Sequence, residues 1–394
     1  MNHFSWLMIV YLLVTTHITI LTVTIYLHRS VAHRSLNVVK PLEHFFRFWC
    51  WMTTGQSTQE WAAVHRKHHA FCEKENDPHS PKIYGFWTVL FKGVALYRRE
   101  AKNPETLSKY GKMCPDDWLE KNLYKKHSMI GLVSLAIAEL AVFGVHGIWI
   151  YIIQIAWIPF WAAGVINGLG HFKGYRNFNT LDDSTNISPI GLIIGGEELH
   201  NNHHAYPTSA KLSMKWYEFD CGWMWIKLLS WCHLVKINKV HRLPIRNHHL
   251  YRMKLRDTNV DDTVVDVFLS HRYFVWKMFR NNTKASVREQ IREIRLSDEI
   301  LKKYSVKKLK QVFYEYSENL SQDDNSLLNR ILKNEFLKNV HGFKERLWKM
   351  WTDRQTSYQQ LKDNMVQWYE HVSASKCQVM DRFARNLASL RPQM

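Results

Sequence analysis

The stretch EELHNNHH, residues 197–204, places three histidines at the spacing HxxHH. The same spacing occurs in HRKHH, residues 65–69. If both stretches are helical, residues three and four apart share one face, so each stretch presents three imidazoles side by side. Imidazole is the commonest side-chain metal ligand. Two such triplets, separated by about 130 residues, predict a metal site that is closed by folding.

Further histidines follow apolar segments. His28 and His33 form HxxxxH after the apolar run Phe4–Leu27, and His171 lies four residues after Asn167 at the end of another run. Five residues correspond to about 500° of α-helical rotation, so His28 and His33 either diverge toward different metals or flank the end of the helix. One HxxHH among 22 histidines would be unremarkable, but two HxxHH stretches together with HxxxxH and the Asn167/His171 pair indicate a site.

The number of imidazoles indicates more than one metal. A tetrahedral zinc uses four ligands and a catalytic zinc three, so nine imidazoles suit two metals of four or five ligands each, completed by an oxygen ligand or a water. Zinc and iron would both accept these ligands. The candidate metal-site residues are His28, His33, His65, His68, His69, His171, His200, His203 and His204.

Composition limits the classes of function. The net charge of +18 requires an anionic partner, and anionic lipid of the cytoplasmic leaflet is the simplest one because apolar segments are concentrated in the first 235 residues. The sequence has no RNA-recognition signature, zinc finger or leucine zipper, so we do not expect a nucleic-acid partner. The six cysteines are scattered without CxxC, which indicates a reducing compartment and argues against a thiolate metal site.

Three apolar segments predict a membrane-embedded bundle. Phe4–Leu27 has no formal charge and is long enough to cross a hydrocarbon core of about 30 Å. Arginines follow it where a signal peptide would have a cleavage site, and the positive-inside rule places its end at the cytoplasmic surface. Met129–Val145 and Ile148–Leu169 predict a transmembrane hairpin. Between them and the first segment, Phe45–Val64 predicts one buried, interfacial or re-entrant helix.

Several polar residues have two interpretations each. Asp77 and His79 either orient ligand imidazoles or cap a turn. Glu197 and Glu198 either balance metal charge or serve as carboxylates at a helix N-terminus. Glu139, inside an apolar segment, is either functional or paired within the bundle.

Aromatic and basic residues suggest where a substrate binds. Candidates for lining an apolar tunnel are Trp61, Trp157 and Trp161, although aromatics at a membrane interface look the same. Basic residues near the histidines either hold a phosphate-rich or acidic carrier or contact lipid and set topology; these are Arg66, Lys67, Lys173 and Arg176.

The composition changes near residue 240, so we expect two domains, residues 1–238 and 239–394. Before the boundary, Lys211–Val235 has a Trp-rich amphipathic pattern that predicts an interfacial helix, and Pro189–Gly196 predicts a short apolar helix or a dip into the membrane. After it, Leu255–Met394 is basic and helix-prone, which predicts a cytoplasmic helical extension, with a coiled coil as one form. It carries no cytochrome b5 or iron–sulfur signature.

The set HxxxxH, HRKHH, NGLGHFKGYRNF (167–178) and HNNHH resembles the integral-membrane fatty acid desaturases over roughly residues 5–235, most closely the bacterial acyl-CoA Δ9 (stearoyl-CoA-type) branch. The resemblance implies an all-α integral-membrane helical bundle with a cytoplasmic His-rich di-iron cap, followed by the helical extension. It implies that the nine histidines bind two iron ions (Fe2+/Fe3+) and that Asn167 holds a water. The single clear span before HxxxxH, where many relatives have two, and the long tail depart from the family pattern.

The resemblance also implies a reaction. It is the O2-dependent insertion of a cis double bond, at Δ9, into a saturated fatty acyl thioester, acyl-CoA or acyl-ACP (acyl carrier protein), for unsaturated fatty acid biosynthesis. The location would be the bacterial inner membrane with the site facing the cytoplasm, and the donor a ferredoxin or cytochrome b5 with its reductase. The alternatives are a related membrane di-iron hydroxylase acting on alkyl or carotenoid substrates and a membrane metal carrier. The HxxxxH spacing and the Asn167/His171 pair favour the desaturase.

Overall fold

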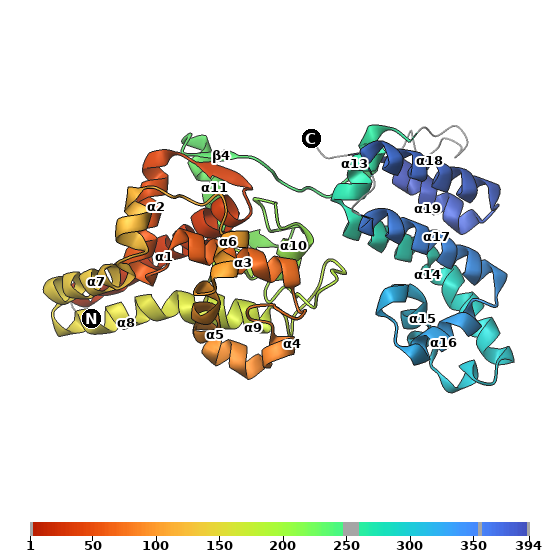
Figure 1. Ribbon diagram of the computed structural model, residues 1–394, viewed down its shortest axis with the longest axis horizontal. Coiled ribbons are helices and arrows are strands. Elements are labelled where there is room, and N and C mark those ends of the chain that lie inside the picture. The colour runs from red at the N-terminus through yellow and green to blue at the C-terminus, as the bar shows by residue number, and fades with distance from the viewer. Residues whose placement is uncertain (1–2, 247–259, 354–356, 392–394) are drawn as a thin grey trace. The chain divides into compact units, whose positions relative to one another are not determined.

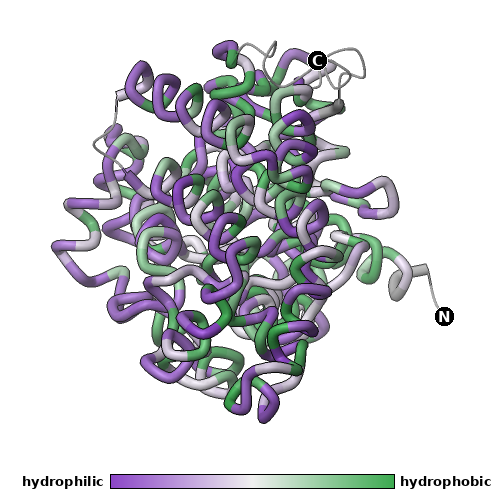
Figure 2. The backbone as a smooth tube through the Cα atoms, turned by 90° about the vertical axis from the view of Figure 1, so that its right-hand side faces the viewer, coloured by the Kyte–Doolittle hydropathy of each residue, from purple (hydrophilic) through white to green (hydrophobic). Residues whose placement is uncertain are grey.

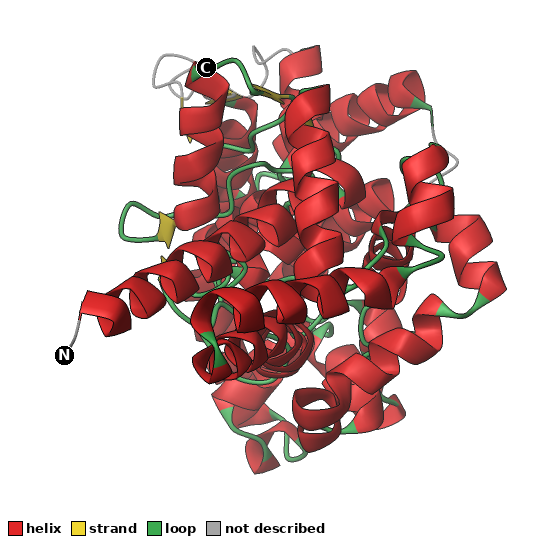
Figure 3. Cartoon of the chain, turned by 90° about the vertical axis from the view of Figure 1, so that its left-hand side faces the viewer, coloured by secondary structure: helices red, strands yellow, loops and turns green. Residues whose placement is uncertain are grey.

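The computed structural model describes residues 3–246, 260–353 and 357–391. The chain divides into two compact units, Met1–His241 and Arg242–Met394 (Figure 1). Helices dominate and the strands are short (Figure 3). The predicted all-α class is confirmed.

The first unit begins with a long apolar helix in two parts, α1 (His3–Leu21) and the π-helix η1 (Thr22–Ala32). By length and composition, Trp6–Ala32 could cross a membrane, and so could Val145–Leu169. In a π-helix, residues five apart are hydrogen-bonded, and such segments are frequent at functional sites. The N–H of His33 donates to the carbonyl of His28 at 3.0 Å, directly after η1 ends.

The prediction of one helix over 45–64 is wrong, because the segment forms two helices, α2 (Lys40–Thr54) and α3 (Thr58–Phe71). Gly55, with φ of 64°, ends α2 in the left-handed conformation that glycine adopts at no steric cost. The Ser57 hydroxyl then accepts the N–H of Glu60 and starts α3 as its N-cap. The break lets α3, which carries HRKHH, run in its own direction.

The predicted helical hairpin is present. Its first arm is α7 (Ser128–Phe143), which is shorter than a full span, and its second arm is α8 (Val145–Ile158). The π-helix η3 (Pro159–Ile166) and the single turn α9 (Asn167–Leu169) continue the second arm. Glu139 accepts hydrogen bonds from Tyr11 at 3.2 Å and Gln154 at 2.8 Å, so it is paired within the bundle.

Helix α5 (Phe86–Ala101) packs along η3 through two glycines. A Cβ atom on Gly93 would lie 2.2 Å from the carbonyl oxygen of Ala163, and one on Gly164 would lie 2.5 Å from that of Leu90. The other helices of this unit are α4 (Pro81–Tyr84), α6 (Pro104–Tyr110), η2 (Glu120–Tyr124), α10 (His200–Ala205) and α11 (Cys221–Trp231).

Two small strand pairs connect the loops of this unit. Strand β1 (Leu36–Val38) pairs antiparallel with β4 (Val235–Ile237), and β2 (Ile190–Gly191) pairs parallel with β3 (Phe219–Asp220). Residues 189–196 form a strand and turns, so the helical alternative for this segment is wrong. The predicted helix over 211–235 is limited to α11, although Trp216 before it is 95% exposed and Trp231 at its end 80%.

The helices predicted for the second unit are present and form a bundle with its own apolar core, whereas a coiled coil was one form that the sequence allowed. Hydrophilic and hydrophobic residues alternate along its helices (Figure 2). Strands β5 (Ile245–Arg246) and β6 (Leu390–Arg391) join its two ends. The helices are α13 (Asp262–Ser270), α14 (Arg272–Ser297), η5 (Leu301–Lys303), α15 (Val306–Tyr314), η6 (Ser317–Asn319), α16 (Gln322–Ile331), α17 (Glu335–Thr352), α18 (Tyr358–Ala374) and α19 (Gln378–Ala388).

The close approach of α5 to η3 gives a stability prediction. We expect Gly93→Ala to lower the free energy of unfolding of the first unit by about 1–3 kcal/mol, because the new methyl group would overlap the Ala163 carbonyl. Thermal unfolding in detergent measures the change. It is monitored by the labelling of Cys50 and Cys221, which are buried until the unit unfolds. Gly342→Ala is the matched control, since open space surrounds Gly342 in α17 and alanine there should stabilise its own unit. Equal stability of Gly93→Ala and the unsubstituted chain would contradict the packing.

Candidate metal centre

The nine predicted histidines all come together in the first unit. They arrive from four places in the chain: η1 and the residue after it, α3, the turn after α9, and α10. Of the two alternatives for His28 and His33, the structure shows the end of the helix between them and not divergence toward different metals. The π-helix η1 ends at Ala32, and the two rings lie 4.7 Å apart and belong to one group.

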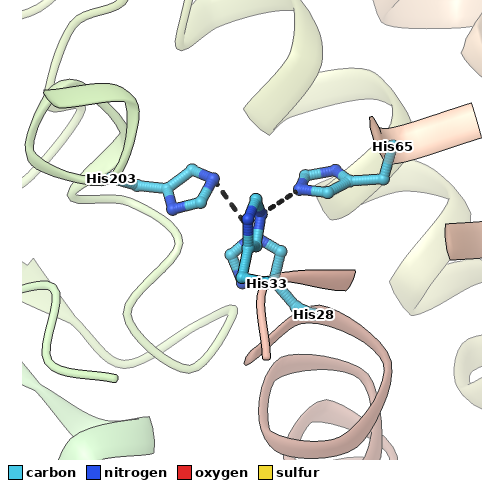
Figure 4. A group of neighbouring side chains, drawn as sticks. All are labelled: His28, His33, His65 and His203. Atoms are coloured by element: carbon cyan, nitrogen blue, oxygen red, sulfur yellow. Dashed lines mark hydrogen bonds between the residues drawn. The ribbon is translucent and has the colours of Figure 1, made fainter. Parts of the chain in front are cut away.

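Figure 4 shows the first group, in which His28, His33, His65 and His203 point toward one another. We call it cluster A and include His69, which joins it through contacts with His65 and His203. The Nε2 atoms of cluster A make four successive contacts. The distances are 2.7 Å for His33–His65, 3.1 Å for His65–His69, 2.9 Å for His69–His203 and 3.2 Å for His203–His28.

Hydrogen bonds cannot satisfy all four contacts of cluster A. An imidazole Nε2 atom carries either one hydrogen or one lone pair, so at most two contacts in such a series can be good hydrogen bonds. A cation bound by the lone pairs satisfies every nitrogen at once. Imidazole nitrogens bind metals at about 2.0–2.1 Å, which places neighbouring ligand atoms about 3 Å apart, as observed here.

The second group is cluster B, which contains His68, Cys72, His171 and His204, with His200 beside them. The Nε2 atoms of His200 and His171 lie 2.9 Å apart. The Nε2 atom of His204 is buried and has no hydrogen-bond partner in the described structure. A buried polar atom without a partner is costly, so this nitrogen also fits a metal ligand. His69, His203 and His204 form a third overlapping group that links the clusters.

Asn167 is not part of either cluster. It opens α9 and lines a cavity whose wall also contains His200 and His65. A group held by Asn167 would therefore lie in the cavity and face the histidines.

Carboxylates fix the far side of four imidazoles, each at its Nδ1 atom. Glu197 lies 2.9 Å from His28, Asp77 3.0 Å from His68, Glu73 3.0 Å from His171 and Asp182 3.1 Å from His204. Carboxylates on the second ring nitrogen fix the tautomer and orientation of metal-binding histidines. The sequence interpretation included Asp77 and Glu197 but missed Glu73 and Asp182. Each of these four carboxylates lies within a few residues of a histidine box or in the loop that leads to one. This proximity is the signal by which the sequence could have identified them.

Burial favours the neutral form of several imidazoles in both clusters. Burial, together with repulsion from neighbouring imidazoles, holds the pKa of His65 and of His69 well below the usual value. The same two causes lower the pKa of His200 and of His203. Neutral imidazole is the form that binds metals, so these side chains need not lose a proton first.

A buried ion pair positions cluster A. Arg29, next to His28, donates to Asp220 at 2.9 Å and to the carbonyl oxygens of Gly195 and Ala210 at 2.8 and 2.9 Å. It therefore joins η1 to the loop that carries Glu197. Arg29 is one of the arginines that follow the first apolar segment in the sequence, but its side chain is only 1% exposed and is held inside the unit.

Other polar residues have structural partners. Arg66 donates to the carbonyls of Val31 and Tyr110, and Lys67 pairs with Glu100. Neither is available for the phosphate-binding role that the sequence suggested. Arg176 donates to the carbonyl of Thr180 in its own loop.

Contacts also define what Glu198 and His79 do. Glu198 accepts the backbone N–H groups of Ile193 and Ile194 at 2.6 and 3.1 Å, so it stabilises a loop. The ring of His79 stacks on His68 at 4.5 Å. Burial, with repulsion from His68, lowers the pKa of His79 to about 3, so this ring is neutral beside cluster B.

A cavity of about 540 Å³ opens directly onto the histidines. Its wall combines His28, His65 and His200 with apolar residues such as Leu132 of α7 and Ile158 of α8. Its size falls within the usual range of about 300–1,000 Å³ for ligand sites. Its apolar wall suits an alkyl chain.

Only one of the three predicted tunnel tryptophans lines this cavity. Trp61 stacks on His65 with ring centroids 4.9 Å apart, so it forms the cavity wall beside cluster A. Trp157 and Trp161 instead pack against the apolar core that contains Ile166.

Comparison with known proteins separates the same two units. A family model described as fatty acid desaturase matches residues 4–227, more than half of the chain. A family model described as transposase matches residues 262–394, which lie in the second unit.

Curated relatives match the first unit. The sn-1 stearoyl-lipid 9-desaturase of Synechocystis is 30% identical over 220 residues, which are 54% of this chain and 66% of that protein. An acyl-CoA 5-desaturase of Anemone leveillei is 32% identical over 221 residues, 55% of this chain and 67% of that protein. The sn-1 stearoyl-lipid 9-desaturase of Anabaena variabilis is 28% identical over 234 residues, 58% of this chain and 83% of that protein. The chain thus covers about two thirds of the length of the first two relatives.

The carboxylates give a metal-binding prediction. We expect Asp182→Asn to lower metal affinity by roughly 10–100-fold, because the amide no longer orients and polarises His204. Metal content of the purified chain after dialysis against a chelator series measures the change. Asp183→Asn is the matched control, since the Asp183 side chain is 63% exposed and pairs with Lys82. Equal metal retention by the two variants would contradict the role of Asp182.

Proposed function

The chain belongs to the fatty acid desaturase family, a family of oxidoreductases, and we propose that it is an O2-dependent desaturase that inserts a cis double bond into a saturated fatty acyl chain. The observation that carries the proposal is the apolar cavity whose wall includes imidazoles of both clusters. An alkyl chain in this cavity would lie against the metal-binding residues, with water excluded by Trp61 and its apolar neighbours.

We propose two iron ions as the resident metals. Cluster A would hold one ion, and His68, His171, His200 and His204 of cluster B would hold the other. Bound iron supplies, with O2 and two electrons from a donor, the oxidising power that removal of hydrogen from an unactivated methylene requires. The protein holds the imidazoles neutral and oriented. Asn167, in the cavity wall, would hold a water beside the site.

The position of the new bond depends on how far the chain enters the cavity. We propose a Δ9 product, as the names of the Synechocystis and Anabaena relatives suggest. Relatives named for acyl-lipid and for acyl-CoA substrates both occur. We propose acyl-CoA or acyl carrier protein thioesters here, because Arg98 and Lys102, at the end of α5, line the same cavity and suit an anionic carrier.

We propose that the first unit is embedded in the bacterial inner membrane with the histidines facing the cytoplasm. The two apolar helices support the embedding. With Arg29 buried, Arg34 and Lys40 after the first of them support the orientation. The electron donor would be a separate ferredoxin or cytochrome b5 with its reductase.

Product analysis tests the proposal. Cells expressing the chain with a donor should contain a cis-monounsaturated fatty acid, located by methyl ester profiling, that is absent from cells expressing His203→Ala. The loss follows because His203 makes two of the four Nε2 contacts in cluster A. The matched control is His146→Ala, at the exposed tip of the α7–α8 hairpin, which should keep full activity.

The outcomes separate the reactions. A hydroxylated lipid would contradict desaturation and indicate the related hydroxylase reaction. No change in any lipid from inserted, iron-loaded protein supplied with a donor would contradict both and favour a metal carrier.

The cavity gives a second prediction, on chain length. Leu132→Trp narrows the cavity at α7, so we expect the product distribution to shift toward shorter chains. Each methylene that cannot be buried costs about 0.8 kcal/mol, or roughly fourfold in preference. The control is Ile137→Trp in the same helix, because the Ile137 side chain is 63% exposed. An unchanged chain-length profile for Leu132→Trp would show that the acyl chain lies elsewhere.

A further inference from the structure

The positive charge of the second unit is concentrated in one part of it. Residues 272–310 contain twelve Lys and Arg and four Asp and Glu. Residues 311–394 contain twelve Lys and Arg and ten Asp and Glu. The excess charge therefore lies in α14, α15 and the segment between them.

Four of these cations form a row on α14. Arg280, Lys284, Arg288 and Arg292 recur every four residues and are all exposed. Residues four apart on an α-helix share a face, and the rise of 1.5 Å per residue places them about 6 Å apart along a row of about 18 Å. Buried Thr283, Val287 and Ile291 immediately precede the last three of these cations, so they form a parallel row about 100° around the helix, which packs into the core.

The neighbouring helix adds a fifth cation. The pKa of Lys310 on α15 is lowered, mainly by burial and to a smaller extent by repulsion from Lys284, Arg288, Arg280 and Arg292. We call these five side chains the basic face. Like charges at this spacing destabilise a helix, so the arrangement has a cost in the free chain.

Carboxylates do not relieve this repulsion. Among the described residues, none forms an ion pair with Lys284, Arg288, Arg292 or Lys310. Lys308, two positions from Lys310, pairs with Asp324 at 2.8 Å, so neighbouring charges are neutralised where a partner exists. Arg280 has a partial partner, since it lies 5.2 Å over the ring of Tyr314. In the described part of the chain, the basic face thus combines four cations outside ion pairs with one cation held over an aromatic ring.

We propose that the basic face docks on the phosphate headgroups of anionic phospholipid at the membrane surface. The proposal rests on the membrane placement of the first unit proposed above. The chain that leaves β4 leads directly into the second unit, so this unit cannot diffuse away from the bilayer. Such a tether raises the effective concentration of the surface for its target.

The chemistry of the basic face suits phospholipid. Clusters of four to eight Lys and Arg on a helix next to membrane spans bind anionic headgroups, and each cation adds to the attraction. Guanidinium groups bind phosphate through paired hydrogen bonds, and three of the five residues are arginines. The row turns by about 120° around α14 between Arg280 and Arg292, and the long, exposed Lys and Arg side chains of this arc can reach one plane of headgroups.

Energy transfer in nanodiscs tests the docking. The full chain, with Cys114→Ser and Cys232→Ser, carries a donor dye on Cys377 of the second unit, and the lipid headgroups carry an acceptor. We expect greater transfer in nanodiscs containing phosphatidylglycerol than in pure phosphatidylcholine. Because the attraction is electrostatic, transfer should fall by roughly half or more at about 0.5 M NaCl.

Charge reversal supplies the matched variants. The double variant Arg288→Glu and Arg292→Glu should reduce transfer in anionic nanodiscs to the level in neutral ones. The control reverses two exposed charges elsewhere, Lys338→Glu and Arg382→Glu, and should retain the transfer. The salt titration uses the unsubstituted basic face, so it tests the proposal even if a variant misfolds.

Three results would overturn the proposal. They are equal transfer in neutral and anionic nanodiscs, equal loss in both double variants, and displacement from anionic nanodiscs by a short DNA duplex whose binding depends on Arg288 and Arg292. The last result would assign the surface to nucleic acid. The readout needs neither metal nor acyl substrate, so a failure of desaturation leaves it unaffected.

Discussion

The mutual approach of buried imidazole nitrogens is the constraint on which the first unit depends. In cluster A, five Nε2 atoms make contacts of 2.7–3.2 Å that hydrogen bonds alone cannot satisfy. Four separate chain segments have to meet to create them. Without a cation, burial of these lone pairs would cost free energy with little return. We propose that a bound cation makes the same groups cross-links between helices that are far apart in sequence, which would couple metal binding to folding of this unit.

The backbone delivers these groups through local departures from the α-helix. The π-helix η1 and the end of the helix at Ala32 turn His28 and His33 to one side, and the π-helix η3 leads into Asn167. Buried Arg29 then joins η1 to β3 through its ion pair with Asp220 and to the loop before α10 through the carbonyl of Gly195. Breaking such a pair leaves a buried charge uncompensated. The positions of the imidazoles thus depend on backbone geometry and on contacts in which no imidazole takes part.

The sequence predicted what is encoded by composition and spacing. The histidine boxes, the apolar segments and the change near residue 240 were visible because ligand type, helix periodicity and charge are local properties. The sequence left the approach of His28 and His33 as one of two alternatives, since α-helical spacing implies divergence unless the helix ends between them and no residue signals a π-helix. The break at Gly55 was missed because a left-handed glycine inside an apolar run looks like any other glycine. The partners Glu73 and Asp182 depend on tertiary contacts, which one sequence does not reveal.

The central claim is that two iron ions bind in the two histidine clusters. Anomalous diffraction of the purified, iron-loaded full chain at the iron absorption edge tests it most directly. The account predicts two separate peaks, one among His28, His33, His65 and His203 and the other among His68, His171 and His204. A single peak, or peaks that appear at the zinc edge and not at the iron edge, would contradict it.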